Sequence, residues 1–454
     1  MATAYLTRTP GSAGDRKTWT LSGWYKRSAN ASDYLLSSGQ YSSTQLSQIL
    51  FEGDDYFNVA FYSSGAALEG HLETNRKFRD PAAWYHIVVA MDTTQAVAAD
   101  RLKIYVNGVQ ETSFKTETYP AEDYEPSINN NVAQNIGRRE GSGFFNGVMA
   151  HVHFTDGTAY APTAFGETDS TSGIWIAKTS PSVTYGTNGY FLKFQDTSAF
   201  GDDSSGNTND FTMSGTITQT KDTPDDNFAT LNPLTVVSSG TPTLANGNTT
   251  VTGDGSTKFY FASTLGMGAG KFYSEYKINA TQASATIHLG IASKPSLNAY
   301  NNEFPGENTI SYSWGEFGST WYNNSGTAQG TSFTTGDVVG IALDMDNSNL
   351  YFSKNGTWIS IGGTTGDPTS GASGTGALSI NSADANGGNG FWHFAIGDNS
   401  GTYGTGNVID CNFGNGYFGT TAVSSAGTNA SGIGTFEHDV PTGYTALSTL
   451  GLME

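Results

Sequence analysis

Apolar and polar residues alternate along most of the chain, which is the period of a β-strand with one buried face. Two segments show it without interruption, at Leu102, Ile104 and Val106 and at Val148, Ala150, Val152 and Phe154. The first runs into Asn107-Gly108, which suits a type I′ turn because both central residues of that turn need positive φ. Near the start, Trp19 and Leu21 share a face, and Gly23-Trp24 then shifts the parity as a β-bulge would. Antiparallel strands are therefore expected through residues 1–165.

The second half repeats this pattern. Strand faces are predicted at Phe272, Ser274, Tyr276 and Ile278, at Ala285, Ile287, Leu289 and Ile291, and at Val339, Ile341, Leu343 and Met345. The last of these is followed by a further strand and by Asn355-Gly356, again a type I′ turn signal. The fold class expected is therefore all-β, with two antiparallel jelly-roll or β-sandwich domains.

The amino-acid composition changes between the two halves. Residues 166–232 hold short strand-like pieces among Asp, Ser, Gly, Asn and Thr, which favour turns. Asn232-Pro233 marks a boundary, because the residue before a proline is pushed towards extended geometry. We expect a domain at 1–165, a β-rich connector at 166–232, a second domain at 233–415 and a C-terminal extension at 416–454 that packs on the second domain.

Composition narrows the functional class. The 454 residues carry 21 Lys+Arg against 41 Asp+Glu, a formal net charge of −20, and no basic cluster is evident, so nucleic acid is not an expected partner. No apolar run approaches the ~18 residues of a membrane span, and residues 1–8 lack the apolar region of a signal peptide. The single cysteine, Cys411, alternates with Ile409 and Phe413 and is expected to be a small core residue.

Two family resemblances rest on specific motifs. Residues 84–92 (WYHIVVAMD) and 103–108 (KIYVNG) resemble laminin-G-like, concanavalin-A-type jelly rolls, and residues 270–276 (GKFYSEY), 336–344 (GDVVGIALD) and 352–356 (FSKNG) resemble the SPRY domain. This order of modules, with its connector, resembles surface proteins of tailed bacteriophages. The resemblance implies a virion component, either a tail or head fibre that contacts the host or a capsid decoration protein.

Catalytic chemistry finds little support in the residues. Retaining glycoside hydrolysis needs two carboxylates about 5–5.5 Å apart. Glu52 and Asp54 come closest to such a pair, but Gly53 and Asp55 make this segment read as a polar hairpin tip. No Gly-x-Ser-x-Gly elbow is evident either. The chain is therefore expected not to be an enzyme and to have no catalytic residues, with glycan hydrolysis as the weaker alternative.

Two groups of side chains are candidate metal ligands. Asp203, Ser205, Asn207 and Asn209 present oxygens at alternate positions of a loop, as calcium prefers, although Asx and Ser turns explain the same residues. His151 and His153 lie two apart on one predicted strand, on the face opposite Val148 and Phe154. Two imidazoles are too few for a site within one chain, and ordinary hydrogen bonding on a sheet face is the alternative. No cofactor is expected other than, at most, calcium.

Aromatic side chains are the candidate ligand contacts. Trp314, Trp321 and Tyr322 lie in a segment dense in aromatics and amides, which is typical of carbohydrate sites. In the SPRY resemblance this hairpin's aromatics lie mostly in the core, so packing is the competing interpretation. SPRY domains in general bind peptide or protein ligands with loops at one end of the sandwich.

Together with the resemblance to phage surface proteins, the sequence leads us to expect a non-enzymatic virion protein that binds a host-surface glycan or protein, with capsid decoration as the alternative. The expected partners are other virion proteins, the host surface and further copies of this chain, a trimer if the protein is a fibre. No membrane insertion is expected. The oligomerisation rests on the analogy with fibres alone.

Overall fold

The computed structural model describes residues 3–29, 31–40, 45–235, 237–238, 241–255, 258–282, 286–293, 303–399 and 406–454. Within these ranges the protein is built from β-strands and contains no α-helix, so the predicted all-β class is confirmed. Nor does this part of the chain hold a helix long and apolar enough to cross a membrane. Its helical turns are short 3-10 segments: η1 (Ala98–Asp100), η2 (Pro162–Ala164), η3 (Pro233–Thr235), η4 (Pro368–Ser373), η5 (Ala385–Gly387) and η6 (Gly451–Met453).

The chain divides into two compact units, residues 1–219 and 220–454. The sequence placed a connector at 166–232, but residues 166–219 are part of unit 1. They supply strands to both of its sheets, and Tyr190 and Phe211 enter its core. The sequence does not show that this segment belongs to unit 1, because short strands among Gly, Asn and Asp have little periodicity of apolar residues.

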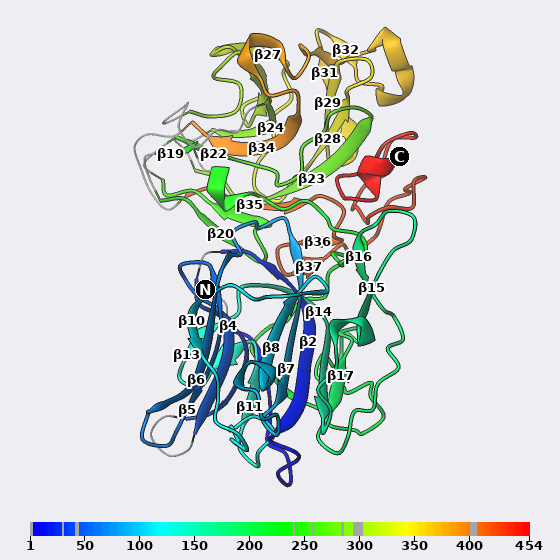
Figure 1. Cartoon of the computed structure of the whole chain (residues 1–454). Helices are drawn as coiled ribbons and strands as arrows, with labels where there is room; N and C mark the ends of the chain where they lie inside the picture. The colour runs from blue at the N-terminus through cyan, green and yellow to red at the C-terminus, as the bar shows by residue number, and fades with distance from the viewer. Residues whose placement is uncertain are drawn as a thin grey trace. The chain divides into compact units, whose positions relative to one another are not determined.

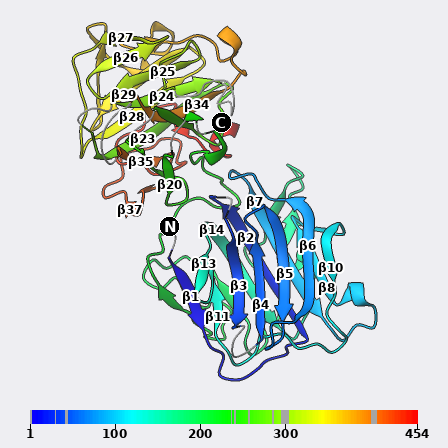
Figure 2. The same ribbon diagram turned by 90° about the vertical axis from the view of Figure 1, so that its left-hand side faces the viewer.

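Unit 1 is a sandwich of two antiparallel sheets (Figures 1 and 2). The eight-stranded sheet runs, in spatial order, β10 (Phe114–Thr118), β6 (Leu68–Lys77), β5 (Tyr56–Tyr62), β4 (Leu46–Phe51), β3 (Asp33–Gly39), β11 (Gln134–Ile136), β1 (Tyr5–Arg8) and β18 (Thr212–Ser214). The six-stranded sheet runs β17 (Tyr190–Leu192), β14 (Gly147–Asp156), β2 (Thr18–Arg27), β7 (Trp84–Asp92), β8 (Leu102–Val106) and β9 (Val109–Gln110). Two small pairs complete it: β12 (Arg138–Arg139) with β13 (Ser142–Phe144), and β15 (Gly166–Thr168) with β16 (Trp175–Ala177).

The core of unit 1 lies between the two sheets. Its members alternate along the strands as the sequence predicted, for example Leu102, Ile104 and Val106 on β8. The turn after β8 has φ of 48° at Asn107 and 82° at Gly108, the geometry of the predicted type I′ hairpin.

Two strands of unit 1 differ from the predicted parity. Strand β2 pairs with β7 in one unbroken register, so the bulge predicted at Gly23-Trp24 is absent and Trp24 lies on the face opposite Trp19. The bulge is instead in β14, between Ala150 and His153, where His151 has a φ of 49°. Val148 and Ala150 therefore do not share the face of Val152 and Phe154, although the sequence alternates without a break.

Unit 2 is also a two-sheet sandwich. Its seven-stranded sheet runs β19 (Val237–Ser238), β22 (Phe259–Ala262), β34 (Trp392–Asp398), β24 (Ile287–Ser293), β25 (Ser311–Gly315), β26 (Ser319–Tyr322) and β27 (Ser325–Ala328). Its nine-stranded sheet runs β20 (Thr243–Ala245), β21 (Thr250–Thr252), β35 (Val408–Asn412), β23 (Lys271–Ala280), β28 (Val338–Asp344), β29 (Asn349–Lys354) and β30 (Thr357–Trp358), with β33 (Leu378–Ser379) on β29 and β38 (Thr445–Ala446) on β23. Two hairpins stand apart: β31 (Ser360–Ile361) with β32 (Thr364–Thr365), and β36 (Tyr417–Phe418) with β37 (Thr421–Ala422).

The predicted strand faces of unit 2 lie in its core, apart from Ala285, which falls outside the described residues. Asn355 and Gly356 have φ of 49° and 77° and form the predicted turn between β29 and β30. Cys411 is fully buried among these apolar side chains, as predicted.

Each unit covers the outer face of one sheet with its own chain. In unit 1, segment 157–186 lies on the six-stranded sheet, where Trp175 Nε1 donates to His86 Nδ1 at 2.9 Å and burial lowers the pKa of His86 to about 3. In unit 2, the C-terminal segment lies on the nine-stranded sheet, where the backbone N–H groups of Glu437 and His438 donate to the carboxylate of Glu275 at 2.7 and 2.8 Å. These segments shield two of the four outer sheet faces.

Candidate functional site

The predicted aromatic ligand contacts do not form one surface. Trp314 is 0% exposed and packs in the core of unit 2, with its ring 4.9 Å from that of Phe333. Tyr322 stacks on Tyr312 at 4.6 Å, and its hydroxyl accepts from Asn381 Nδ2 at 3.1 Å. Because neighbouring residues of a strand point to opposite faces, Trp321 lies on the other side of the sheet.

Trp321 is half-buried on the outer face of the seven-stranded sheet. Its indole lies beside Gly326 and Gly315, where an added Cβ would come within 2.9 and 3.1 Å of the ring. The rings of His288 and Phe304 meet it edge-on at 5.5 and 5.6 Å. The indole thus fits a slot made by glycines and by the segment that carries Phe304, which gives it a packing role.

The two predicted histidine ligands lie together on the outer face of the six-stranded sheet. Their ring centroids are 6.5 Å apart. His153 shares a hydrogen bond between Nδ1 and the hydroxyl of Tyr185 at 2.9 Å and stacks on Phe191 at 3.8 Å. Burial lowers the pKa of His153 far below its ordinary value, so this imidazole is neutral. Stacking and hydrogen bonding account for the pair without a metal.

The four predicted calcium ligands form a turn organised by hydrogen bonds. The carboxylate of Asp203 accepts from the backbone N–H groups of Phe191, Ser205 and Asn209 at 2.8–2.9 Å. The amides of Asn207 and Asn209 donate to backbone carbonyls. No group of three or more His, Cys, Asp or Glu side chains in the described ranges is arranged to hold a metal ion. Calcium binding here remains a prediction. It requires the oxygens of Asp203 to give up hydrogen bonds from backbone N–H groups in order to bind the ion.

A different site emerges on the outer face of the eight-stranded sheet, the side turned away from the six-stranded sheet. Strand register brings polar residues into one row, because directly paired residues of antiparallel strands point to the same face. The pairs Asn135↔Ser37, Ser37↔Gln48, Gln48↔Ala60 and Ala60↔His71 cross β11, β3, β4, β5 and β6 in turn. The neighbouring row pairs Asn58 with Glu73. Strands β3 to β6 lie side by side in Figure 2.

We call the side chains gathered here the outer-face cluster; they are Gln48, Glu52, Asn58, His71, Glu73, Lys115 and Asn135. Asn58 is its centre, because its Nδ2 donates to Glu52 Oε1 at 3.0 Å and to His71 Nε2 at 2.9 Å. With Nε2 as an acceptor, this assignment puts the imidazole proton on Nδ1. Burial lowers the pKa of His71, which favours the neutral ring.

The carboxylates of the cluster differ in their partners. Lys115 Nζ lies 3.0 Å from Glu73 Oε1 and 3.6 Å from Asp54 Oδ2, while Thr116 Oγ1 donates to Glu73 Oε2 at 3.2 Å. Glu52 is half-buried and has no ion-pair partner within the described part of the chain. Burial raises its pKa, and the charges of Glu73 and Asp54 raise it further. Of Glu52, Asp54 and Glu73, Glu52 is therefore the one that makes no ion pair with a described residue.

Several buried polar atoms of the cluster lack a hydrogen-bond partner among the described residues. They are Oε1 of Gln48, Oδ1 of Asn58 and both Oδ1 and Nδ2 of Asn135. Gln48 and Asn58 are 5% exposed and Asn135 is 1% exposed. An unpaired buried polar group costs about 1–3 kcal/mol, so native proteins supply such groups with water or a ligand.

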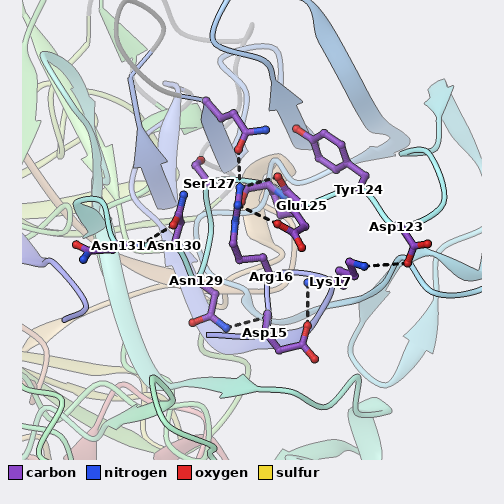
Figure 3. Close-up of polar contacts among 12 residues, drawn as sticks. Asp15, Arg16, Lys17, Asp123, Tyr124, Glu125, Ser127, Asn129, Asn130 and Asn131 are labelled. Atoms are coloured by element: carbon purple, nitrogen blue, oxygen red, sulfur yellow. Dashed lines mark hydrogen bonds and ion pairs between the residues drawn. The ribbon is translucent and has the colours of Figure 1, made fainter. Parts of the chain in front are cut away.

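A second polar network in unit 1 is closed by contrast (Figure 3). Asn129 is 2% exposed, its Nδ2 donates to the backbone oxygen of Asp15 and to Asp156 Oδ1, and its Oδ1 accepts from Asn188 Nδ2. Beside it, Arg16 donates from Nε, Nη1 and Nη2 to Pro126, Glu125 and Gln45. We call this the Asn129 network; it joins the N-terminal segment to the loop between β10 and β11.

Sequence reasoning named only Glu52 of the outer-face cluster. Asn58, His71 and Glu73 carry a weak signal, since each occupies the polar position of an alternating strand. That pattern predicts that a side chain points outward, but it does not predict which side chains of the adjacent strands lie next to it. The pairing of β5 with β6 decides which polar residues meet, and register is not visible in one strand alone.

Comparison with known proteins supports the two folds. Residues 2–162 match the model of the Concanavalin A-like lectin/glucanases superfamily, and residues 271–370 match that of the SPRY domain. The chain therefore carries a concanavalin A-like domain followed by a SPRY domain. Each match covers less than half of the chain.

Individual relatives match only in part. The dual specificity protein kinase splA of Dictyostelium discoideum is 37% identical over 59 residues, which are 13% of this chain and 2% of the length of that kinase. Two solved structures are similar at lower identity: the SPRY domain of human HERC1 (15% identity, 40% of this chain, 96% of that chain, TM-score 0.29) and a heptameric SAP-like pentraxin of Limulus polyphemus (11%, 39%, 86%, TM-score 0.28).

Proposed function

We propose that the protein is a non-enzymatic carbohydrate-binding protein whose ligand contacts the outer-face cluster of unit 1. One observation carries the proposal: buried amides of Gln48, Asn58 and Asn135 keep unpaired donors and acceptors on one sheet face. Sugar hydroxyls both donate and accept, so they complement a row of amides better than an apolar ligand does. The match of this unit to a lectin and glucanase superfamily is consistent with such a ligand.

A glycan array probed with the full chain tests this function. We expect binding to at least one class of oligosaccharide, and Gln48→Leu is expected to weaken it by about tenfold, the effect of about 1.4 kcal/mol. The matched control is Gln219→Leu, which removes an amide of unit 1 that lies outside the cluster. Equal affinity of wild type and Gln48→Leu for every bound glycan contradicts the proposal.

Glycan hydrolysis is the second candidate, favoured by one specific observation. Burial raises the pKa of Glu52, and Glu73 beside it is ion-paired to Lys115. Glycosidases likewise divide their two roles between a carboxyl group with a raised pKa and a second carboxylate. Binding is preferred because the side chains of Asn58, Lys115 and Thr116 already occupy oxygens of both carboxylates. Release of reducing ends that stops in Glu52→Gln supports hydrolysis instead.

The location of this activity is proposed from the order of the two domains. A virion surface, with other virion proteins and further copies of this chain as partners, follows from the phage resemblance alone. Binding of the purified protein to host cells favours a fibre, whereas binding to capsids without host cells, at a copy number that matches the capsid lattice, favours decoration. The host-cell binding experiment also tests whether unit 2 recognises a host protein.

A further inference from the structure

The carboxylates near Glu52 favour a ligand that carries a positive charge. Three carboxylates, Glu52, Asp54 and Glu73, share this part of the face, and Lys115 ion-pairs with the latter two. Glu52 is held by Asn58 Nδ2 and by the hydroxyl of Ser32, neither of which is charged. A half-buried carboxylate gains most from a positively charged donor, because charge-assisted hydrogen bonds are about twice as strong as neutral ones.

A second acceptor lies beside that carboxylate. Asn58 is 5% exposed, and its Nδ2 is committed to Glu52 and His71, which fixes the orientation of the amide. Its Oδ1 then remains an acceptor with no partner in the described structure. An ammonium group carries three N–H donors and no acceptor, so it matches a carboxylate and an amide oxygen that lie together.

We propose that the outer-face cluster binds an amino sugar, with the ligand's ammonium group between Glu52 and Asn58 Oδ1. This inference rests on the proposed carbohydrate-binding function and names its ligand class. The ammonium group takes the place of the cation with which Glu52 makes no ion pair, and a neighbouring hydroxyl of the ligand meets the amide of Gln48, which lies one strand from Asn58. The net charge of −20 draws a cationic ligand towards the protein, which makes binding sensitive to salt.

Titration calorimetry with two matched ligands tests the inference on the full chain. The probes are a glucosamine oligosaccharide with free amines and the N-acetylglucosamine oligosaccharide of the same length, in buffer near neutral pH, because acid protonates the Glu52 carboxylate as well as the amine. Wild type is expected to bind the free-amine ligand about tenfold more tightly, and this preference is expected to disappear in Glu52→Gln. Glu167→Gln, an exposed carboxylate on β15, is the control and is expected to keep the preference.

The outcomes separate the inference from the function on which it rests. Equal binding of the two oligosaccharides, equally reduced by Gln48→Leu, overturns the amino-sugar inference and leaves carbohydrate binding standing. Binding of neither sugar overturns the inference as well. A lysine peptide serves as a third probe, because its side chain supplies the same ammonium group. Binding of that peptide alone, lost in Glu52→Gln, overturns a sugar ligand in favour of a protein one.

Discussion

Two buried asparagines of unit 1, Asn129 and Asn135, lie close together in the sequence but differ in whether their side-chain amides are hydrogen-bonded. Asn129 uses both atoms of its amide, in bonds to Asp15, Asp156 and Asn188. Asn135 is as deeply buried and uses neither atom within the described structure. Both belong to a unit with one fold and one core, so the fold does not explain the difference. The difference between the two asparagines therefore distinguishes polar groups whose hydrogen bonds join segments of the chain from polar groups that have no partner within the described structure.

The same contrast distinguishes the outer sheet faces. The six-stranded sheet of unit 1 and the nine-stranded sheet of unit 2 are covered by segments of the chain that satisfy His86 and Glu275. The slot of Trp321 on the seven-stranded sheet is filled by aromatic rings. The eight-stranded sheet differs because three of its buried amides, those of Gln48, Asn58 and Asn135, keep atoms with no hydrogen-bond partner among the described residues. It is therefore the face on which a ligand has the most to add.

The largest expected effect comes from breaking the closed network. Asn129→Gly is expected to lower the free energy of unfolding of unit 1 by about 2–3 kcal/mol, because it leaves buried partners unsatisfied. Glycine is the suitable replacement, since Asn129 has a φ of 64° that other side chains disfavour. Chemical denaturation measures the loss. Asn135→Leu is the paired variant and is expected to change the stability by less than about 0.5 kcal/mol. A loss at residue 135 as large as that at residue 129 removes the distinction between the two sites.

The second effect concerns ligand affinity. Asn58→Leu removes the central amide of the outer-face cluster while keeping its volume, and we expect glycan affinity to fall by tenfold or more, about 1.4 kcal/mol. Asn129→Gly is expected to leave the affinity of the folded protein unchanged. Titration calorimetry of both variants, below their unfolding temperatures, provides the test. The comparison fails when the two variants weaken binding equally.

A third, smaller effect follows from the raised pKa of Glu52. A carboxyl group whose pKa is higher in the folded than in the unfolded protein is more readily protonated when folded, so its contribution to stability falls as pH rises. Glu52→Gln is therefore expected to be more stable than wild type at neutral pH and equal to it in acid. Because the group is half-exposed, solvent screening limits the gain to a few tenths of a kcal/mol. Thermal unfolding across pH 3 to 7 shows the sign, and a gain that grows in acid contradicts it.

The smallest effect is expected at Trp321. Trp321→Ala is expected to change glycan affinity by less than about twofold, although it lowers the stability of unit 2 because a packed indole is lost. Loss of binding in this variant, with an unchanged fold by circular dichroism, moves the ligand site to unit 2.

The sequence predicts the strands better than it predicts the sites. Alternation along β8 and the Asn107-Gly108 turn are local properties, and both are confirmed. The bulge in β14 is not local, since Val148 to Phe154 alternate without interruption and only the structure shows His151 breaking the register. Trp314 and Trp321 look alike in the sequence, and one lies in the core while the other faces outward.

The outer-face cluster was beyond prediction for a related reason. The sequence shows Glu52 as a candidate acid beside Asp54, but its hydrogen bond comes from Asn58 on the next strand. The charge of Glu73, one strand further, raises the pKa of Glu52 together with that of Asp54. Sequence spacing gives the face of each polar residue, and strand pairing decides which residues meet. Whether a buried amide is satisfied depends on every neighbour around it. For this reason Asn129 and Asn135 cannot be told apart from the sequence.

Hydrogen exchange of the full chain, with and without a glycan that binds it, tests the central claim most directly. The ligand is expected to slow exchange in peptides that span β4, β5, β6 and β11 and to leave exchange in β25, β26 and β27 unchanged. Slowed exchange confined to β25, β26 and β27, with the eight-stranded sheet of unit 1 unaffected, contradicts the claim that the outer polar face of that sheet is the binding site.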